Sequence, residues 1–350
     1  METKPKILVT GATGFLASRL IFELLSQGYT VRGTVRDLNN GKKLAPLKLF
    51  PNAKENLELV KADLLDDKCW DLVVKGCSIV HHTASPFPIN APKNENDIIK
   101  PAVQGTLNVL KACTTNKVQT VVFTSSTAAI ASYGKMNKVH YTEDDWATLA
   151  TCPAYQKSKT LAEQEAWKYY KTLDPSTRFK MTSINPTLIL GPTLVNTDFT
   201  SGDIVRQLMI GAFSKAPRVM FTVVDVRDVA HAHIAAMKNP DADGKRYILD
   251  SGTAFWMKDM CAILRKEYAH YGYKIPTEEM KYCFIKFGAI FSKQAESIIP
   301  LWNVEFYYSN EKAKKDLGIS FIPGEVALLE MAKSLIANGV VPDKISKKAK

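Results

Sequence analysis

The chain of 350 residues is 46% hydrophobic and 23% charged, which is enough to bury a large core in one big domain or two interlocked ones. Its net charge of +11 would suit nucleic acid or an anionic membrane surface, but some of the excess lies in the basic tail DKISKKAK, so we expect neither partner. No secretory leader and no apolar run of roughly 20 residues is evident. The six cysteines lack metal-like spacing and suit a reducing cytosol. We therefore expect a cytoplasmic protein without a metal site.

Short β-branched runs alternate with segments of helical periodicity in the first half of the chain. This alternation is typical of a parallel sheet covered by helices. Strands are expected over Lys6–Thr10, Thr30–Arg36, Leu57–Ala62, Ser78–Thr83, Thr120–Thr124 and Lys180–Ile184. Helices are expected over Gly14–Gln27, Asp67–Lys75, Glu95–Thr115 and Tyr155–Thr172. The sequence therefore predicts an α/β fold with a doubly wound parallel sheet.

Beyond Pro186 the alternation becomes irregular. Helices are expected over Asp203–Phe213, Met257–Tyr271, Gly324–Asn338 and the stretch DVRDVAHAHIAAMKN, and KRYILDSG reads as a strand that could rejoin the sheet. We expect residues 1–187 and about 224–251 to form the sheet domain, and about 188–223 and 252–338 to form a smaller, mostly helical C-terminal domain. Residues 339–350 are expected to be a disordered basic tail.

The stretch TGATGFLA follows the first expected strand and opens the first expected helix. Gly11 permits a tight turn, Gly14 lets the backbone approach a pyrophosphate, and Ala17 lets the helix pack close to the sheet. A glycine-containing turn without a ligand is the alternative, since the spacing is G-x-x-G-x-x-A. The position after a strand and before a helix favours a Rossmann-type dinucleotide site.

The end of the second strand, TVRGTVRD, indicates which dinucleotide is bound. An acidic residue there accepts a hydrogen bond from the ribose of NAD, whereas a cation accommodates the extra phosphate of NADP. Arg36 is the preferred candidate because a guanidinium suits a phosphate. Asp37 would become the ribose acid if the strand ended one residue later, and a solvated basic strand end without a ligand is the other alternative. NADP is favoured over NAD.

Tyr155 and Lys159 stand four residues apart, on one face of an expected helix. Tyr282 and Tyr308 also have a lysine four residues on, but only the helix of Tyr155 follows a strand, TVVFTSS, that would open onto the cofactor side of the sheet. A nearby ammonium favours the phenolate and so brings a tyrosine closer to useful acidity. Ser125 and Ser126 would point to opposite sides of the strand, so at most one of them can join Tyr155.

These motifs together resemble those of the extended short-chain dehydrogenases/reductases. The resemblance rests on TGATGFLA, TVRD, KADL, HTASP, FTSS, YQKSK, INPTLILGP and DVRDVA, and runs from about Lys6 to about Asn338. Within that family the chain is similar to the group that contains dihydroflavonol 4-reductases, cinnamoyl-CoA reductases and yeast-type methylglyoxal and ketone reductases. The resemblance implies an NADP-binding sheet domain and a substrate-binding second domain.

The resemblance also implies roles for individual residues. Ser126 would bind the carbonyl oxygen, Tyr155 would donate the proton, and Lys159 would hold the nicotinamide ribose and lower the pKa of the tyrosine. Arg36 and Lys43 would meet the 2′-phosphate of NADP. The remaining cofactor contacts would come from Gly11, Thr13, Gly14, Phe15 and Leu16 at the pyrophosphate, Asp63 and Leu64 at adenine, Thr83 and Ala84 at the ribose side, and Pro186 and Leu188 at the nicotinamide.

The substrate is less well indicated. An asparagine that contacts the flavonoid ring in plant dihydroflavonol reductases is replaced here by Ala131, and the NWYCYGK signature of cinnamoyl-CoA reductases is replaced by PAYQKSK. Neither plant activity is therefore assumed. Pocket-lining positions are expected at Ser85, Phe87, Ala131, Tyr133, Thr193, Phe213 and Phe221, although core packing is the alternative for each.

The sequence thus predicts an NADPH-dependent carbonyl reductase that acts on a small-molecule aldehyde or ketone, as a monomer or homodimer. One alternative is an NAD-linked enzyme of the same fold, such as a hydroxysteroid-type dehydrogenase or a sugar-nucleotide epimerase. Another is a non-catalytic regulator that senses NADP. Structural roles are expected for His81, His82, His231 and His233, because their spacing does not direct a pair to one side of a strand or helix.

Overall fold

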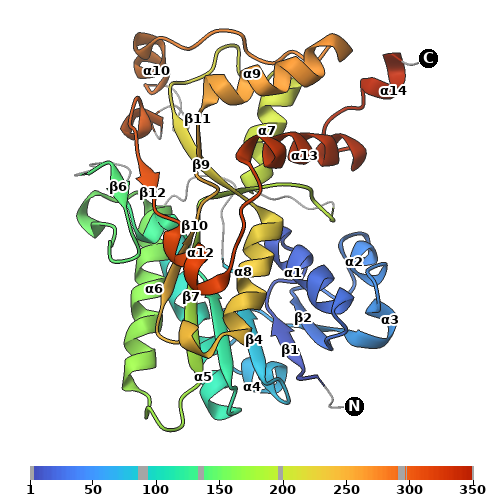
Figure 1. Ribbon diagram of the computed structural model, residues 1–350, viewed down its shortest axis with the longest axis vertical. Helices are drawn as coiled ribbons and strands as arrows, with labels where there is room; N and C mark the ends of the chain where they lie inside the picture. Colours follow the sequence, from blue (N-terminus) through green and yellow to red (C-terminus); the bar gives the residue numbers. More distant parts are fainter. Residues whose placement is uncertain are drawn as a thin grey trace.

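A seven-stranded sheet forms the centre of the computed structural model, which describes residues 4–85, 94–132, 138–195, 200–290, 296 and 298–348 (Figure 1). The strand order is β10-β7-β5-β4-β1-β2-β3, and every neighbouring pair is parallel. The strands are β1 (Ile7–Val9), β2 (Val31–Val35), β3 (Leu57–Lys61), β4 (Ile79–His82), β5 (Thr120–Thr124), β7 (Lys180–Pro186) and β10 (Arg246–Leu249). This topology confirms the predicted Rossmann-type doubly wound sheet.

Side chains of the central strands are buried on both faces of the sheet. In β1, Ile7 and Val9 belong to one hydrophobic cluster and Leu8 to another, as the two-residue period of a strand requires. The first cluster packs against α1 (Phe15–Ser26) and α8 (Val226–Lys238). The second packs against α4 (Trp70–Val74), α5 (Asn96–Thr115) and α6 (Ala154–Thr172). Burial on both faces explains why these strands read as continuous apolar runs.

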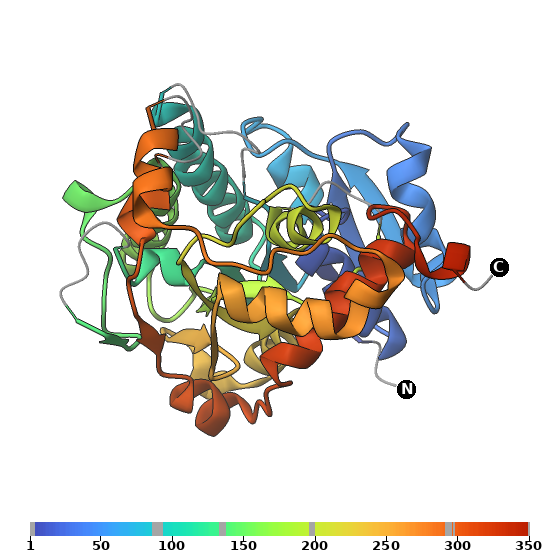
Figure 2. The ribbon, with the colours of Figure 1, turned by 90° about the horizontal axis from the view of Figure 1, so that it is seen from above.

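A second lobe covers the carboxyl ends of the central strands (Figures 1 and 2). Its three-stranded sheet has the order β11-β9-β8 and is assembled from β8 (Leu188–Leu190), β9 (Met220–Asp225) and β11 (Thr253–Trp256). The helices α7 (Thr200–Ile210), α9 (Met257–Tyr268) and α13 (Gly324–Ala337) surround it, and α13 contacts both of the others. The helices agree with prediction, whereas none of the three strands was predicted. The expected domain boundaries remain a prediction.

Two segments from the range expected for the second domain lie instead against the first. The helix α12 (Glu311–Leu317) packs on β10 and α8, where the Tyr247 hydroxyl donates to Asp316 Oδ2 at 3.0 Å. The strand β12 (Tyr307–Tyr308) pairs with β6 (His140–Tyr141). The other α-helices given for the described residues are α2 (Gly41–Lys48), α3 (Ala53–Asn56), α10 (Tyr282–Gly288) and α14 (Ile345–Lys348). Short 3-10 helices cover Thr127–Ala129, Leu149–Thr151, Pro240–Ala242, Ala269–Tyr271 and Ile299–Leu301.

The C-terminal segment is attached to the second lobe over its described part. Val341 is fully buried, and the Tyr273 hydroxyl donates to the Pro342 carbonyl at 2.8 Å. The short helix α14 follows. The expectation of a disordered tail is therefore wrong for residues 339–348, because Val341 supplies an apolar anchor within this polar segment. Within the described ranges, no helix is both long and apolar enough to span a bilayer.

Candidate active site

The strand order of the central sheet reverses between β1 and β4, and a crevice at such a point is where open α/β sheets bind ligands. A cavity of about 520 Å³ lies here, lined by the carboxyl ends of the central strands and by the second lobe. The predicted site residues that line it are Phe15, Leu16, Thr83, Ser85, Ser126, Tyr155, Lys159, Pro186, Leu188 and Phe221. Residues from several separate segments of the chain thus meet in one space.

The glycine loop has the backbone geometry that a dinucleotide site requires. Gly11 has φ +73°, and a Cβ atom there would lie 3.2 Å from Cβ of Ala84. The Gly14 N–H donates to the Gly11 carbonyl at 2.8 Å, which closes the turn. No side chain caps the N-terminus of α1, and its first turn holds no acidic residue. A diphosphate therefore fits against the positive end of this helix dipole.

A buried hydroxyl holds the ends of β1 and β4 together beside this loop. Thr10 Oγ1 accepts the backbone N–H groups of Thr83 at 3.1 Å and Ala84 at 2.9 Å, and lies 3.0 Å from His82 Nδ1. Burial, with a smaller contribution from the charge of Lys159, lowers the pKa of His82 to about 3. His82 is therefore neutral and structural, as expected.

The exposed end of β2 carries the residues expected to choose between NAD and NADP. Arg36 and Asp37 both lie just beyond the strand and are exposed. Asp37 Oδ1 accepts the Asn39 N–H at 2.9 Å, which forms a local turn after the strand. Arg32 is held away from this end of the strand, since it bonds Glu58 and the carbonyls of Val73 and Lys75. Of these two arginines, Arg36 is the one whose guanidinium lies at the exposed end of β2, where the 2′-phosphate is expected.

Asp63 and Leu64 follow β3 at the same edge of the sheet. The Asp63 carboxylate accepts the Leu65 N–H at 2.9 Å, and its carbonyl accepts the indole N–H of Trp70 at 3.0 Å. Leu64 packs against Gly105, where a Cβ atom would lie 2.8 Å from Leu64 Cβ. This turn is therefore held in one conformation at the expected adenine position.

The two serines after β5 have different partners. Ser125 also lines the cavity, but its Oγ donates to Glu163 Oε2 at 2.5 Å, so its proton already has an acceptor. Ser126 Oγ accepts the Ala128 N–H at 3.1 Å and keeps its own proton for another acceptor. The Ser126 hydroxyl therefore has a proton to donate, and its role in binding the carbonyl oxygen stays a prediction.

Tyr155 and Lys159 project from the first turns of α6, which begins at Ala154 directly after Pro153. Tyr155 is partly buried and Lys159 is only 8% exposed. Burial lowers the pKa of the Lys159 ammonium to about 8, and the negative charge of Glu163 opposes that shift. A phenol, an ammonium and the Ser126 hydroxyl therefore line the same cavity, which is the set needed to bind and protonate a carbonyl oxygen.

Some expected pocket positions lie elsewhere. Ala131 is fully buried in a core cluster with Ile130 and Tyr141 and is not among the residues that line the cavity. Thr193 bonds the Val195 carbonyl at 2.7 Å, and Phe213 packs against the main core. Phe87 and Tyr133 lie outside the described residues. The apolar lining that sequence reasoning missed is Ile189, Ile204, Val219, Met220, Leu301 and Phe306.

Sequence reasoning also missed a buried polar cluster under the site. Glu163, Asn185 and Arg246 are each at most 8% exposed and are joined by hydrogen bonds. The only signal in the sequence is that Glu163 stands four residues after Lys159, in KSKTLAE. That spacing places both residues on one face of α6.

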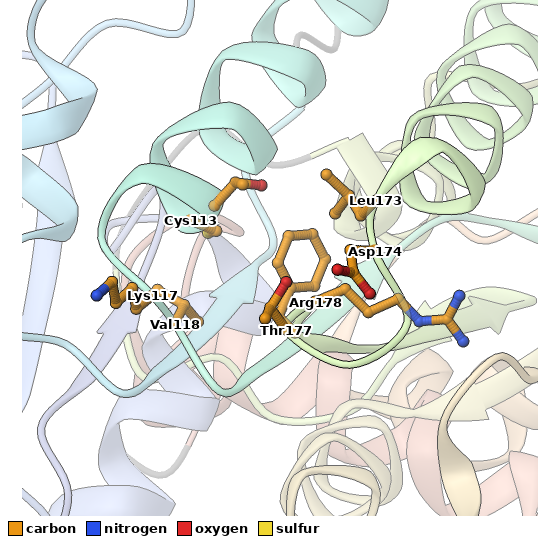
Figure 3. Close-up of a pocket in the computed structure, with 9 residues that line it drawn as sticks. Cys113, Lys117, Val118, Leu173, Asp174, Thr177 and Arg178 are labelled. Atoms are coloured by element: carbon orange, nitrogen blue, oxygen red, sulfur yellow. The ribbon is translucent and has the colours of Figure 1, made fainter.

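A second cavity, of about 120 Å³, lies at the opposite edge of the sheet, where β5 and β7 begin (Figure 3). It is lined by Cys113, Lys117, Asp174 and Arg178, among others, and by none of the predicted site residues. Burial raises the pKa of the Cys113 thiol far above its usual range, so this thiol is not a nucleophile. We assign the chemistry to the larger cavity.

Comparison with known proteins gives a consistent result. The family model described as the NAD dependent epimerase/dehydratase family matches residues 7–250. The chain is 37% identical over 336 residues to cinnamoyl-CoA reductase CAD2 of Medicago truncatula, covering 94% of this chain and 95% of that protein. It is 38% identical over 291 residues to dihydroflavonol 4-reductase of Dianthus caryophyllus, covering 79% of this chain and 76% of that protein.

Solved structures are similar over nearly the whole chain. The yeast methylglyoxal/isovaleraldehyde reductase Gre2 complexed with NADPH superposes with a TM-score of 0.79 at 27% identity, covering 96% of this chain and 99% of that one. Gre2 of Candida albicans in complex with NADPH gives a TM-score of 0.77 at 28% identity, with 95% and 99% covered.

Proposed function

Because this chain belongs to the NAD dependent epimerase/dehydratase family, among the extended short-chain dehydrogenases/reductases, we propose that it is an NADPH-dependent reductase of aldehydes or ketones. One observation carries the proposal: Tyr155, Lys159 and Ser126 line a single cavity together with Phe15 and Leu16 of the glycine loop. An acid and a hydroxyl donor are thereby placed beside the expected position of the cofactor. The reductase names of the relatives agree with this reaction.

The residues at the crevice fit NADPH. Gly11, Thr13, Gly14 and the start of α1 would hold the pyrophosphate, and Arg36 with Lys43 would meet the 2′-phosphate. Thr83 and Ala84 would lie along the ribose side, and Pro186 and Leu188 against the nicotinamide. Bound NADPH would supply a hydride to the carbonyl carbon. The NADPH in the related Gre2 structures supports this choice over an NAD-linked dehydrogenase or epimerase.

The protein supplies the proton and the polar contacts to the carbonyl oxygen. Ser126 would donate a hydrogen bond to this oxygen, and Tyr155 would donate the proton that converts it to an alcohol. The negative charge that develops on the oxygen during reduction makes both contacts strongest in the transition state. Lys159 would stabilise the phenolate that remains on Tyr155, because an adjacent ammonium favours the charged form of a phenol.

The substrate should be uncharged and largely apolar near its carbonyl group. The second lobe contributes Ile189, Ile204, Met220, Phe221 and Leu301 to the cavity wall. Lys159 is the only charged side chain among the described lining residues, and it is assigned to the cofactor and Tyr155. A carboxylate or phosphate next to the carbonyl would therefore lose its hydration without gaining a partner.

The direct test is to follow NADPH absorbance with a panel of aldehydes, diketones, hydroxyflavanones and acyl-CoA thioesters. We expect turnover with apolar aldehydes or ketones, and at least tenfold lower kcat/KM for pyruvate. NADPH binding by fluorescence without turnover on any member would instead favour a regulator that senses NADP. Turnover with NADH in preference to NADPH would contradict the cofactor assignment.

A further inference from the structure

A fully buried carboxylate lies behind the wall of the cavity. The Glu163 side chain is 0% exposed and stands one helical turn after Lys159 on α6. Its Oε2 atom accepts Ser125 Oγ at 2.5 Å and Asn185 Nδ2 at 2.8 Å, and its Oε1 atom accepts Trp167 Nε1 at 3.2 Å. A carboxylate without solvent is tolerated only when its lone pairs are satisfied in this way.

The counter-ion of Glu163 is itself fixed from several sides. Arg246 of β10 donates from Nε to Oε1 at 2.7 Å and from Nη2 to Oε2 at 3.3 Å. Its Nη1 donates to the carbonyls of Glu143 at 2.7 Å and Asp145 at 2.8 Å, and its guanidinium stacks 3.8 Å from the ring of Trp146. The position of the Glu163 carboxylate is therefore set by β5, β7, β10 and α6 together.

This cluster is bonded directly to the backbone of the proposed carbonyl-binding residue. Asn185 Nδ2 donates to the Ser126 carbonyl at 3.2 Å as well as to Glu163. Asn185 Oδ1 accepts Ser183 Oγ at 3.0 Å, which fixes the amide plane. One carboxylate thus connects the peptide of Ser126 with the helix that carries Tyr155 and Lys159.

Glu163 also acts on Lys159 through its charge. The titratable groups that face Lys159 are Tyr155 and Glu163 of its own helix and His82 of β4, while Arg246 of β10 reaches Glu163. Burial lowers the pKa of Lys159 to about 8, and the negative charge of Glu163 opposes that shift, so Glu163 favours the charged ammonium. His82 is neutral and does not offset this effect.

We propose that Glu163 is a positioning residue for the reductase reaction: it fixes Ser126 against Tyr155 through Ser125 and Asn185, and it holds Lys159 in its charged form. The inference rests on the proposed function. A merely structural ion pair is the competing explanation, but buried pairs of this kind are often neutral in stability compared with apolar packing. The hydrogen bonds that lead from Glu163 to Ser126, and its charge near Lys159, predict an effect on catalysis that a purely structural ion pair between Glu163 and Arg246 would not have.

The test compares Glu163→Gln with Glu165→Gln in carbonyl reduction between pH 6 and 10. Glu165 lies on the same helix but pairs only with the exposed Lys168, so it is the matched control. The activity of the wild type should fall as Lys159 loses its proton above about pH 8. In Glu163→Gln this fall should begin about one pH unit lower, and kcat at pH 7.5 should drop about tenfold with KM for NADPH changed less than about threefold.

Two further measurements test the positioning of Ser126 and the charge of Lys159 separately. Ser125→Ala keeps the charge of Glu163 and removes one hydrogen bond, so kcat should fall about threefold or more with an unchanged pH profile. Competitive acetylation of Lys159 followed by mass spectrometry reports its protonation without any turnover, and should show the same shift of about one pH unit in Glu163→Gln but not in Glu165→Gln.

The outcomes separate the inference from the proposed function. A wild-type protein that reduces no carbonyl would refute the reductase assignment, and the labelling of Lys159 would still decide the electrostatic role of Glu163. An active wild type whose pH profile and kcat are unchanged in Glu163→Gln and Ser125→Ala would refute the inference alone. If Glu163→Gln does not fold, a Ser125→Ala variant with wild-type kcat would likewise refute the positioning role.

Discussion

Thr10 and His82 share a buried hydrogen bond of 3.0 Å that joins the carboxyl ends of β1 and β4. Because Thr10 Oγ1 already accepts two backbone N–H groups, its own proton must point to Nδ1 of His82. His82 then carries its proton on Nε2, which lies 3.4 Å from the Thr106 hydroxyl. One threonine thus orders the two strand ends between which the cofactor is proposed to bind.

Removing that hydroxyl should weaken both the fold and cofactor binding. In Thr10→Val the N–H groups of Thr83 and Ala84 lose their buried acceptor, at a cost of about 1–3 kcal/mol in the free energy of unfolding for each unsatisfied group. NADPH affinity should fall at least fivefold because Thr83 and Ala84 line its proposed path. Thr120→Val, at the far end of β5, is the control and should leave NADPH affinity unchanged. An equal loss in both variants, measured by urea unfolding and fluorescence titration, would contradict the specific role of Thr10.

Gly11→Ala should separate backbone strain from a local clash. The positive φ alone costs roughly 1–2 kcal/mol for alanine, and the added methyl group would meet Ala84 at 3.2 Å. Gly76 has φ +78° and no neighbouring atom within 4 Å of the place a Cβ atom would take, so Gly76→Ala carries the strain without the contact. We expect Gly11→Ala to lose at least as much stability as Gly76→Ala, and Gly11→Ala alone to lose NADPH affinity, by about tenfold or more. Unchanged affinity in Gly11→Ala would remove the loop from the cofactor site.

Arg36→Ala should abolish the preference for NADPH over NADH. A charge-assisted bond to a phosphate is worth about 1.5–3 kcal/mol, so the Kd for NADPH should rise roughly 10- to 150-fold while the Kd for NADH changes little. Lys54→Ala, another exposed cation of the same half of the sheet domain, is the control. Isothermal titration with both cofactors provides the measurement. A parallel loss of NADH affinity would show that Arg36 acts on stability and not on the 2′-phosphate.

Asp250 should make the fold more stable at mildly acidic pH. It is 3% exposed, its Oδ2 atom has no hydrogen-bond partner among the described residues, and burial raises its pKa to about 7 against the opposing bonds of Gly252 and Thr187. A carboxyl group whose pKa is raised on folding stabilises the fold fully below its unfolded pKa of about 4. This contribution to the free energy of unfolding is lost as the pH rises through the folded pKa of about 7. The total loss is up to about 4 kcal/mol.

Asp250→Asn should remove that pH dependence. Its stability relative to wild type should improve by a few kcal/mol between pH 5 and pH 8, because the wild-type protein must ionise a buried group in this range. Other titrating groups, including His81 and His82, are common to both proteins and cancel in the difference. Asp144→Asn changes an exposed carboxylate and should show no such trend. Urea unfolding at each pH is the measurement, and a constant difference would show that Asp250 does not titrate in this range.

The sequence predicted the sheet domain well because its signal is local. Each central strand is buried on both faces, so β5 occurs over Thr120–Thr124 as expected and the other strands differ by a few residues at their ends. The helix α2 was missed because Pro46 lies inside it, although its N-cap Asn40 accepts the Lys43 N–H at 3.2 Å. Pro46 is the sixth of the eight residues of α2, where it lacks the N–H that would bond the Lys42 carbonyl, so the sequence gives a signal against a helix here.

The site was only partly predictable because much of it depends on contacts between distant segments. Alternation along β5 predicted that Ser125 and Ser126 would differ, but the choice between them depends on Glu163, which lies on another element. Ala131 follows the serines closely in sequence, yet the 3-10 helix Thr127–Ala129 carries it into the core. Half of the missed apolar lining residues lie on β8, β9 and α7, whose arrangement has no local signature.

The central claim is that the phenol of Tyr155 protonates the carbonyl oxygen, and Tyr155→Phe tests it most directly. Tyr282→Phe is the matched control, since Tyr282 also precedes a lysine by four residues but is 46% exposed on α10. With saturating NADPH and the best carbonyl substrate, Tyr155→Phe should lower kcat by about 10²–10⁴-fold while the Kd for NADPH stays within about threefold, and Tyr282→Phe should behave as wild type. A Tyr155→Phe protein that turns over at the wild-type rate would contradict the mechanism.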